Sequence, residues 1–358
     1  MLDIKTNPYK AVSFNENAIM KVAEKAGSLI AQVKYDGVRL NLVAKHTGGF
    51  FLSRTSKVIP ALEHLCGYSE RWENFLADER QIYKGGIMID GEAMIKGVDF
   101  NTGSGILRTK WLSKKNVKFT TQPDYEIPRG MGKVPFELDP QHLKVVVYAV
   151  LPLDVVETGE DHDVMNCVMP YHVDSVIELL VEYFPEIDWV RAESYDVYSM
   201  MQLDKLYEFV RERGDEGLVV KDPLDIYKRG KKTGWWKMKP ENEADGTIVG
   251  LVWGTKGKAN EGKVIGFEVL LESGRVVNAT NISQALMEEF TKEVAKSSGW
   301  LTLKELASIH DHPEALIVNP YAGWACQVSY MEETPDGSLR HPTFDKFRGT
   351  EDNPTEKM

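Results

Sequence analysis

The chain has 358 residues, of which 42% are hydrophobic and 27% are charged, a composition typical of folded globular proteins and not of disordered ones. Its 43 lysines and arginines are outnumbered by 54 aspartates and glutamates, and the resulting net charge of −11 disfavours a nucleic-acid partner bound by overall charge. Without a membrane-length apolar run or a signal-peptide pattern, we expect a cytoplasmic protein with no membrane partner.

The predicted elements alternate irregularly along the chain. Apolar residues at helical spacing predict helices over residues 15–26, 171–183, 200–213 and 283–296. Short apolar or alternating runs predict strands over residues 29–33, 86–89, 144–150, 218–220, 247–253 and 264–271. The polar residues 110–141, rich in proline and glycine, predict a long loop or insertion. This order favours an α+β fold over a doubly wound one.

After Pro240 the pattern changes to short strands around one helix, which favours a small β-barrel of the OB type. We therefore expect one domain over residues 1–240, a second over 241–349 and a tail over 350–358. The three cysteines, Cys66, Cys167 and Cys326, lie far apart, which disfavours a zinc site or a disulfide scaffold.

The first candidate for chemistry is the stretch from Lys34 to Arg39, which reads K-Y-D-G-V-R and follows an apolar strand. A lysine amine becomes a nucleophile only when it is neutral, and burial or nearby cations favour that form. Gly37 permits a close turn, and the guanidinium of Arg39 suits a phosphate or a sugar oxygen. Taken alone, these residues are better explained as an ordinary surface lysine and aspartate at a strand-to-turn junction.

Two further candidates follow along the chain. Residues 53–57 read S-R-T-S-K, and there Arg54 and the hydroxyl groups suit phosphate, although taken alone the segment is better explained as a polar turn. Asp90-Gly91-Glu92 follows an apolar run, so Glu92 suits a ribose hydroxyl or Mg²⁺. The Asp-Gly pair also indicates a hairpin turn, and both interpretations can hold together.

A third group of candidates lies between Glu216 and Lys239 and is mostly basic. Glu216 and Lys221 stand on either side of a short strand, where Glu216 suits a metal and Lys221 a phosphate. In an extended Trp-Trp-Lys-Met-Lys segment, Lys237 and Lys239 share one face and match a triphosphate, although an edge strand with protective lysines is the alternative. Residues 221–239 as a whole predict a local basic face on an acidic protein, or a solvated charged surface.

One apparent phosphate-binding loop is rejected. Residues 257–263 match the G-x-x-x-x-G-K part of a P-loop, but Val264 follows where a serine or threonine is required. The next residues predict a strand where the motif needs a helix. We interpret this segment as a hairpin loop.

In this order, the motifs K-x-D-G-x-R, S-R, D-G-E, E-G-x-x-x-K and K-x-K resemble those of the covalent nucleotidyltransferases, a superfamily of DNA ligases, RNA ligases and mRNA capping enzymes. The similarity is greatest to the short ATP-dependent DNA ligases of T-odd podoviruses, which join a nucleotidyltransferase (adenylation) domain of antiparallel sheets with flanking helices to an OB-fold domain. The resemblance implies a phage enzyme that uses ATP and Mg²⁺ to seal nicked double-stranded DNA in replication, repair or recombination. It further implies a lysyl-AMP and a DNA-adenylate intermediate, and we expect a monomer.

The resemblance also implies roles for matching residues. Lys34 is the expected nucleophile, Glu92 and Glu216 are the expected metal ligands, and Tyr148 is expected to stack on adenine. The implied nucleotide contacts are Gln32, Val33, Lys34, Tyr35, Arg39, Arg54, Glu92, Tyr148, Lys221, Lys237 and Lys239. Contacts to DNA or phosphate are expected from Lys231 and Lys232, and from the Arg340 and Arg348 of a terminal R-x-P-x-F-x-x-x-R-like run.

One position departs from the family pattern. Gln32 stands where these ligases often have glutamate, and its carbonyl oxygen can accept the same hydrogen bond from adenine. The alternatives are an RNA ligase or an mRNA-capping guanylyltransferase of the same superfamily, which differ in the strands they join or in the use of GTP. A non-catalytic OB-type nucleic-acid-binding protein is the remaining alternative, and it would never become adenylated.

Overall fold

The computed structural model describes residues 3–127, 130, 132–299, 317–333 and 337–349, so the predicted tail over 350–358 lies outside the described residues. The chain divides into two compact units, Met1–Met200 with Val219–Lys237 and Met201–Leu218 with Met238–Met358. None of the described helices is both long enough and apolar enough to cross a membrane.

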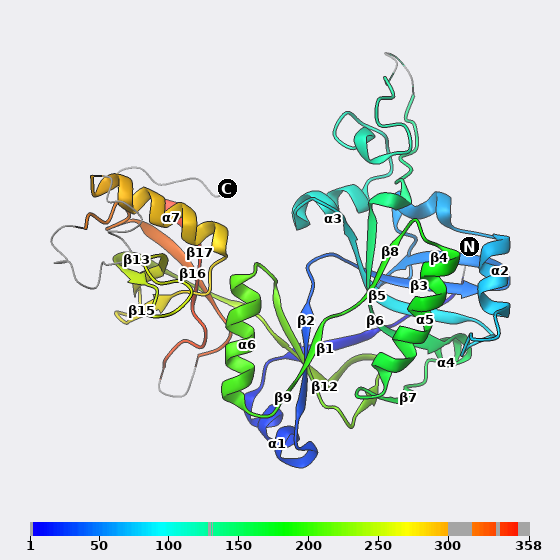
Figure 1. Ribbon diagram of the computed structural model, residues 1–358, viewed down its shortest axis with the longest axis horizontal. Coiled ribbons are helices and arrows are strands. Elements are labelled where there is room, and N and C mark those ends of the chain that lie inside the picture. Colours follow the sequence, from blue (N-terminus) through cyan, green and yellow to red (C-terminus); the bar gives the residue numbers. More distant parts are fainter. Residues whose placement is uncertain (1–2, 128–129, 131, 300–316, 334–336, 350–358) are drawn as a thin grey trace. The chain divides into compact units, whose positions relative to one another are not determined.

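Two sheets, each five-stranded within the described residues, form the framework of the first unit (Figure 1). The first sheet has the order β1 (Tyr9–Ser13), β12 (Gly230–Met238), β10 (Gly217–Lys221), β2 (Leu29–Lys34) and β9 (Ser194–Val197). The second has the order β4 (Gly48–Ser53), β3 (Val38–Lys45), β5 (Ile87–Ile95), β6 (Leu143–Pro152) and β8 (Asp188–Arg191). The ladders of β3 with β4, β3 with β5, β5 with β6 and β2 with β9 are antiparallel, as expected, and each sheet adds a parallel pair at one edge, β1 with β12 and β6 with β8.

Helices flank these sheets. They are α1 (Glu16–Ala26), α2 (Glu70–Ala77), α3 (Phe100–Arg108), α4 (Leu153–Thr158) and α5 (Met169–Tyr183), with 3-10 turns at Pro60–Leu65, Val117–Phe119 and Pro140–His142 and a small ladder of β7 (His162–Met165) with β11 (Ile226–Tyr227). The side chain of Asn15 accepts from the Ala18 N–H and so caps α1, which ends at Gly27 in a left-handed conformation. On α5, the apolar side chains Val173, Val176 and Leu180 enter the main core under the second sheet. The core therefore fixes the second sheet, from which several candidate residues project.

The four predicted helices are confirmed, as are the predicted strands, but two strands are considerably longer than predicted. One is β13, which begins at Asn242 and not at residue 247, and the other is β5. The strand expected over residues 86–89 continues through Asp90, Gly91 and Glu92 as β5. Asp90 pairs with Asn41 and Gly91 with Leu40 of β3 in an antiparallel ladder. The Asp-Gly pair is therefore not a hairpin turn, because ladder partners on both sides hold it extended inside the sheet.

The second unit contains α6 (Met200–Glu212), which contributes all but its first residue, and a sheet with the order β15 (Val276–Ala279), β14 (Val264–Leu271), β13 (Asn242–Trp253), β16 (Ala325–Tyr330) and β17 (Thr343–Gly349). A bridge between Thr280 and Thr343 joins the edges of this sheet, as the predicted OB barrel requires. Helix α7 (Gln284–Ser297) packs on β14, and Phe267 and Phe290 meet in the barrel core with ring centroids 5.0 Å apart. The P-loop-like residues 257–263 lie in the connection between the antiparallel strands β13 and β14, as the hairpin interpretation predicts.

Candidate active site

The candidate nucleophile, Lys34, is the last residue of β2. The residues before it in the strand are all buried, including Gln32, which pairs with Ser194 of β9, and Val33, which donates to the Glu193 carbonyl at 2.8 Å. Lys34 itself is half-buried. A rigid, buried strand therefore presents this amine where the sheet ends.

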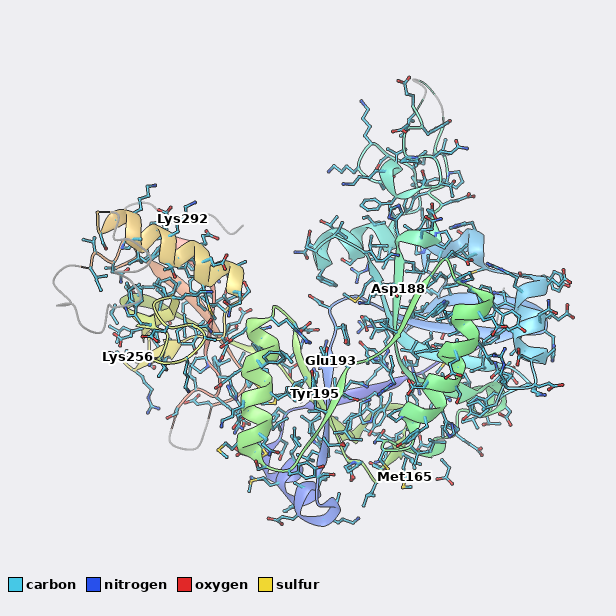
Figure 2. The ribbon with its side chains drawn as sticks, viewed as in Figure 1. Met165, Asp188, Glu193, Tyr195, Lys256 and Lys292 are labelled. Carbon is cyan, nitrogen blue, oxygen red and sulfur yellow. The ribbon has the colours of Figure 1, made fainter. Side chains whose placement is uncertain are left out.

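The turn after Lys34 is fixed by contacts on two sides. The Tyr35 hydroxyl accepts from the Glu193 backbone N–H at 3.2 Å, beside the strand where Figure 2 labels Glu193 and Tyr195. On the other side, a Cβ on Gly37 would lie 2.7 Å from Glu92 Cγ and 2.8 Å from the Ala93 carbonyl oxygen. Only glycine allows the turn to approach β5 this closely.

This close approach leads to a first prediction. Gly37→Ala is expected to displace Glu92 and to cost about 1–3 kcal/mol of folding stability through overpacking. We expect nucleotide transfer to the protein to slow as well, because the displaced groups include a candidate nucleotide contact. Urea unfolding and the rate of self-labelling with ATP measure the two effects, and Gly85→Ala, with open space around its added methyl group, is the matched control. Equal behaviour of the two variants would contradict the prediction.

Arg39 is held by a buried carboxylate. Its Nε and Nη2 donate to the two oxygens of Asp90 at 2.6 and 2.7 Å. Asn41 Nδ2 donates to the same carboxylate at 2.8 Å and the Tyr227 hydroxyl donates at 2.6 Å, so Asp90, which is fully buried, accepts four hydrogen bonds. Burial alone would lower the pKa of Arg39, but the Asp90 carboxylate has the larger, opposite effect. The pKa is therefore raised, and this guanidinium stays charged.

Glu92 lies opposite Arg39 in the ladder between β3 and β5. The Tyr148 hydroxyl of β6 donates to Glu92 Oε2 at 3.1 Å, and the Arg39 guanidinium carbon lies 5.1 Å from the Tyr148 ring centroid. Burial raises the pKa of Glu92 to about 7, against the opposing charges of Arg39 and Lys34. The structure thus brings Lys34, Arg39, Glu92 and Tyr148 into one electrostatic environment.

Lys221 belongs to the same environment. It ends β10, is 4% exposed, and its Nζ lies 3.8 Å from the ring centroid of Trp235. Burial, with the charge of Arg39 as the next cause, lowers the pKa of Lys221 to about 7. A buried ammonium over an indole face and beside a second cation is suited to an incoming anion.

The predicted basic face over residues 221–239 is largely neutralised within the protein. Lys228 pairs with Asp225, and Lys232 pairs with Asp161 at 3.1 Å. The Arg229 guanidinium donates to backbone carbonyls, among them that of Asn7 at 3.0 Å. Lys231 is exposed, and Lys237 is half-buried in β12. Most of this run therefore stabilises the fold and does not form a cationic surface.

Glu216 precedes β10 and forms an ion pair with Lys239, which directly follows β12. A Cβ on Gly217 would lie 2.2 Å from the Met238 carbonyl oxygen, so the two strands approach closely beside this pair. Within the described residues, no group of three or more His, Cys, Asp or Glu side chains is arranged to hold a metal. Mg²⁺ is commonly bound by proteins through one or two carboxylates together with substrate phosphates.

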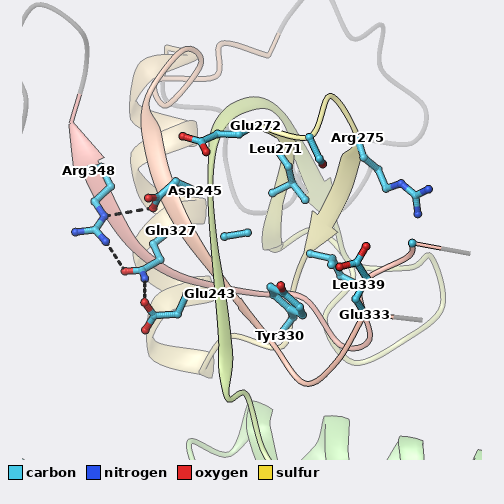
Figure 3. A pocket seen from close by; sticks show the side chains of 13 residues that line it. Glu243, Asp245, Leu271, Glu272, Arg275, Gln327, Tyr330, Glu333, Leu339 and Arg348 are labelled. Atoms are coloured by element: carbon cyan, nitrogen blue, oxygen red, sulfur yellow. Dashed lines mark hydrogen bonds and ion pairs between the residues drawn. The ribbon is translucent and has the colours of Figure 1, made fainter. Parts of the chain in front are cut away.

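The remaining candidates lie elsewhere. Arg54 is exposed in a tight turn after β4, where the Ser53 N–H donates to the Lys57 carbonyl at 2.7 Å. Arg340 pairs with Asp204 of α6 at 3.0 Å. Figure 3 shows Arg348 lying beside Asp245, 3.5 Å away, and donating to Gln327 at 2.9 Å.

The pocket around Arg348 in Figure 3 is predominantly acidic. Its charged lining residues are Glu243, Asp245, Glu272, Glu333, Arg275 and Arg348. Gln327, which accepts from Arg348, also donates to Glu243. Arg340 and Arg348, for which phosphate contacts were expected, therefore form ion pairs with carboxylates in this structure.

Sequence reasoning missed the residues that hold the site together. Asp90 was interpreted through its turn propensity, although Arg39 and Asn41, two residues apart among apolar neighbours in β3, indicate one buried polar face. No sequence pattern marked Tyr227 or Tyr9 as part of the site. The Tyr9 backbone N–H donates to the Tyr227 hydroxyl at 3.0 Å, and the Tyr9 ring stacks on Trp235 at 4.3 Å, so contacts between distant segments create this network.

Two family models match adjacent parts of the chain. The model described as "ATP dependent DNA ligase domain" matches residues 8–239, and the one described as "DNA ligase C-terminal domain" matches residues 240–348. Together they include the adenylation-type sheets and the barrel. They also include every candidate residue named above, and Arg348 is the last residue matched.

Curated relatives are similar over their full length. The chain is 62% identical to the DNA ligase of Escherichia phage T7 over 361 residues, covering 100% of both chains. It is 58% identical to the DNA ligase of Enterobacteria phage T3, covering 99% of both. A solved structure described as the ATP-dependent DNA ligase from bacteriophage T7 in complex with ATP matches with a TM-score of 0.86 and 61% identity, covering 97% of this chain and 100% of that one.

Proposed function

Because the chain belongs to the ATP-dependent DNA ligase family, we propose that Lys34 is the nucleophile that carries AMP during the sealing of nicked duplex DNA. The observation that supports this role is the placement of Lys34 at the end of a buried strand, in the electrostatic environment of Arg39 and Glu92. The enzyme is a DNA ligase, and its nucleotide is ATP.

The reaction has three steps of phosphoryl chemistry. Lys34 attacks the α-phosphate of ATP and pyrophosphate leaves. AMP then passes to the 5′-phosphate at the nick, and finally the adjacent 3′-hydroxyl attacks that phosphate and AMP leaves. Each step concentrates negative charge, which preorganised cations stabilise best in a site that excludes water. Arg39, fixed by Asp90, and the buried Lys221 are preorganised in this sense.

We propose further nucleotide contacts at the positions that match the family's motifs. We assign the ribose to Glu92 and Arg39, the adenine to Gln32, Val33, Tyr35 and Tyr148, and the phosphates to Lys221, Lys237, Lys239 and Arg54. Glu92 and Glu216 are each suited to contribute one ligand to Mg²⁺, which neutralises phosphate charge when bound. The Glu216–Lys239 and Arg340–Asp204 pairs would have to open before those groups meet substrate.

The domain limits and the cellular setting belong to this proposal too. The limits are residues 1–240 for adenylation and 241–349 for the OB fold, and the two family matches, which meet at residues 239 and 240, support them. We place the enzyme, as a monomer, in the cytoplasm of the host cell, since its curated relatives are phage proteins. Roles in phage DNA replication, repair and recombination follow from nick sealing.

The experiment compares label transfer from α-labelled ATP and α-labelled GTP, followed by sealing of nicked duplexes with DNA or RNA on either side of the nick. We expect label from ATP alone and efficient sealing when both strands at the nick are DNA. Label from GTP would indicate a capping enzyme, and sealing confined to RNA ends would indicate an RNA ligase. Absence of a protein-bound adenylate after incubation with ATP and Mg²⁺ would contradict the role of Lys34.

The pKa of Lys221 gives a second prediction. Its ammonium, the form that binds phosphate, is lost as the pH rises through about 7 in the free enzyme. Arginine at this position stays protonated. The ratio of kcat/KM for ATP in Lys221→Arg to that in the wild type should therefore increase by up to about tenfold per pH unit above 7. Self-labelling rates between pH 6 and 9 measure this ratio, and the ratio cancels other ionisations shared by both proteins. A constant ratio would contradict the prediction.

A further inference from the structure

A stretch of strong positive charge lies outside the nucleotide site. Between Asp99 and Asp124 the chain has no acidic residue. The same interval contains five basic residues, which we call the basic arm: Arg108, Lys110, Lys114, Lys115 and Lys118. All five are exposed, and within the described part of the chain none of them forms an ion pair. On a protein with a net charge of −11, such a cluster is a local exception.

The basic arm differs from the other cationic run in what surrounds it. In residues 221–239, Lys228, Lys232 and Lys239 are each paired with a carboxylate, and Lys221 is buried. The basic arm instead directs its charges to solvent, in a segment that Figure 1 shows extending away from the second sheet beyond α3. Its cations therefore remain available to an external anion.

The backbone of the arm is ordered by a buried side chain. Asn116 is 4% exposed, accepts from the Ser113 N–H at 2.8 Å and donates to the Trp111 carbonyl at 2.9 Å. The 3-10 turn at Val117–Phe119 follows, and the Phe119 ring lies in the main core. These contacts hold the lysines before and within the turn in a fixed array, which lowers the entropic cost of binding.

A second backbone segment, residues 134–136, is hydrogen-bonded to the base of the arm. The Leu112 N–H donates to the Val134 carbonyl at 2.8 Å, and the Phe136 N–H donates to the Lys110 carbonyl at 2.9 Å. Phe136 is 2% exposed and belongs to the same core as Phe119. The arm is thus attached at both ends to the packed domain and is not a free loop.

We propose that the basic arm binds the sugar–phosphate backbone of duplex DNA near the nick, at a site separate from the nucleotide contacts. This proposal rests on the proposed function, because it assumes a DNA substrate. A ligase acts on nicks in any sequence, so contacts to phosphates without base recognition are the expected mode. Each phosphate neutralised by a lysine releases counterions and makes the negative slope of log K against log salt steeper by about 0.9.

The test uses the full chain with Lys114→Gln, Lys115→Gln and Lys118→Gln combined. Binding to a nicked duplex is measured between about 50 and 200 mM salt. We expect affinity at the lower salt to fall roughly 10- to 100-fold and the slope to decrease by up to about 2.7, the product of three contacts and about 0.9 each. A Lys→Glu set at the same positions should weaken binding further.

The matched control combines Lys21→Gln, Lys25→Gln and Lys84→Gln, three exposed lysines outside the arm, two of them on α1. It removes the same total charge as the arm variant. Because its lysines lie outside the proposed DNA contact, it should leave the salt slope close to that of the wild type. Self-adenylation, which needs no DNA, is followed in every variant and separates the two proposals. Loss of adenylation in the wild type would overturn the nucleotide site, whereas normal adenylation with the same salt slope in the arm and control variants would overturn the basic arm.

Discussion

Replacing Lys34 with alanine is expected to abolish covalent adenylation and, with it, nick sealing from ATP. The loss should be about 10⁴-fold or more, the scale found when a covalent nucleophile is removed. Lys34 lies at the end of a buried strand, and a backbone turn that only Gly37 permits follows it, so the sheet and this turn fix the position of its amine. The intact mass of the protein after incubation with ATP and Mg²⁺ measures the adenylate.

Two further variants make this result specific. Lys34→Arg keeps the charge but should also fail, because the guanidinium does not lose its proton at neutral pH. Lys45→Ala removes the lysine that ends the following strand, β3, and should adenylate normally. Sealing of a pre-adenylated nick should survive in Lys34→Ala to a larger extent than sealing from ATP, since that last step does not need the lysyl-AMP. Retained adenylation in Lys34→Ala would assign the nucleophile to another residue.

The sequence predicted the elements whose signals are local. The helix at α1 carries its own cap at Asn15 and its own stop at Gly27, and β14 matches its predicted range of 264–271 because its apolar run has clear ends. By contrast, the short helices α2, α3 and α4 were missed, since six to nine residues give too few turns for a periodicity to be distinguished from chance. The extension of β5 through Asp90 and Gly91 was missed because its ladder partners overcome the turn propensity of that pair.

The candidate site shows the same division. Its motif residues, such as Lys34, Arg39 and Glu92, stand at strand ends or in short patterns that chemistry alone makes notable. The residues that position them do not, because Tyr9 and Tyr227, 218 positions apart in the sequence, meet only when the chain folds. The net charge likewise did not indicate where cations are available. It combines the basic residues of 221–239, most of which are neutralised within the protein, with those from Arg108 to Lys118, which form no ion pairs within the described residues. Distribution and pairing of charges emerge only from the fold.

The buried Asp90 carboxylate is expected to give the largest effect on stability. Asp90→Ala leaves the Arg39 guanidinium without its partner and removes the acceptor for Asn41 and Tyr227. Breaking a buried ion pair on one side typically costs about 3–5 kcal/mol, and we expect that loss in urea unfolding together with loss of adenylation. Asp174→Ala breaks the exposed pair with Arg191 and should cost less than about 1 kcal/mol, which makes it the matched control.

The double variant Asp90→Leu/Arg39→Met separates the structural role of the pair from its chemical role. Replacing both charges of a buried pair with apolar side chains often restores stability, so we expect part of the loss in Asp90→Ala to be recovered. The rest should remain, because the buried donors of Asn41 and Tyr227 still lack their acceptor. Adenylation should remain lost, because methionine cannot bind the nucleotide as the Arg39 fork does. If the double variant is as unstable as Asp90→Ala, the stranded charge is not the cause of the loss. If it adenylates at the wild-type rate, Arg39 does not contact the nucleotide, and Asp90 serves the fold alone.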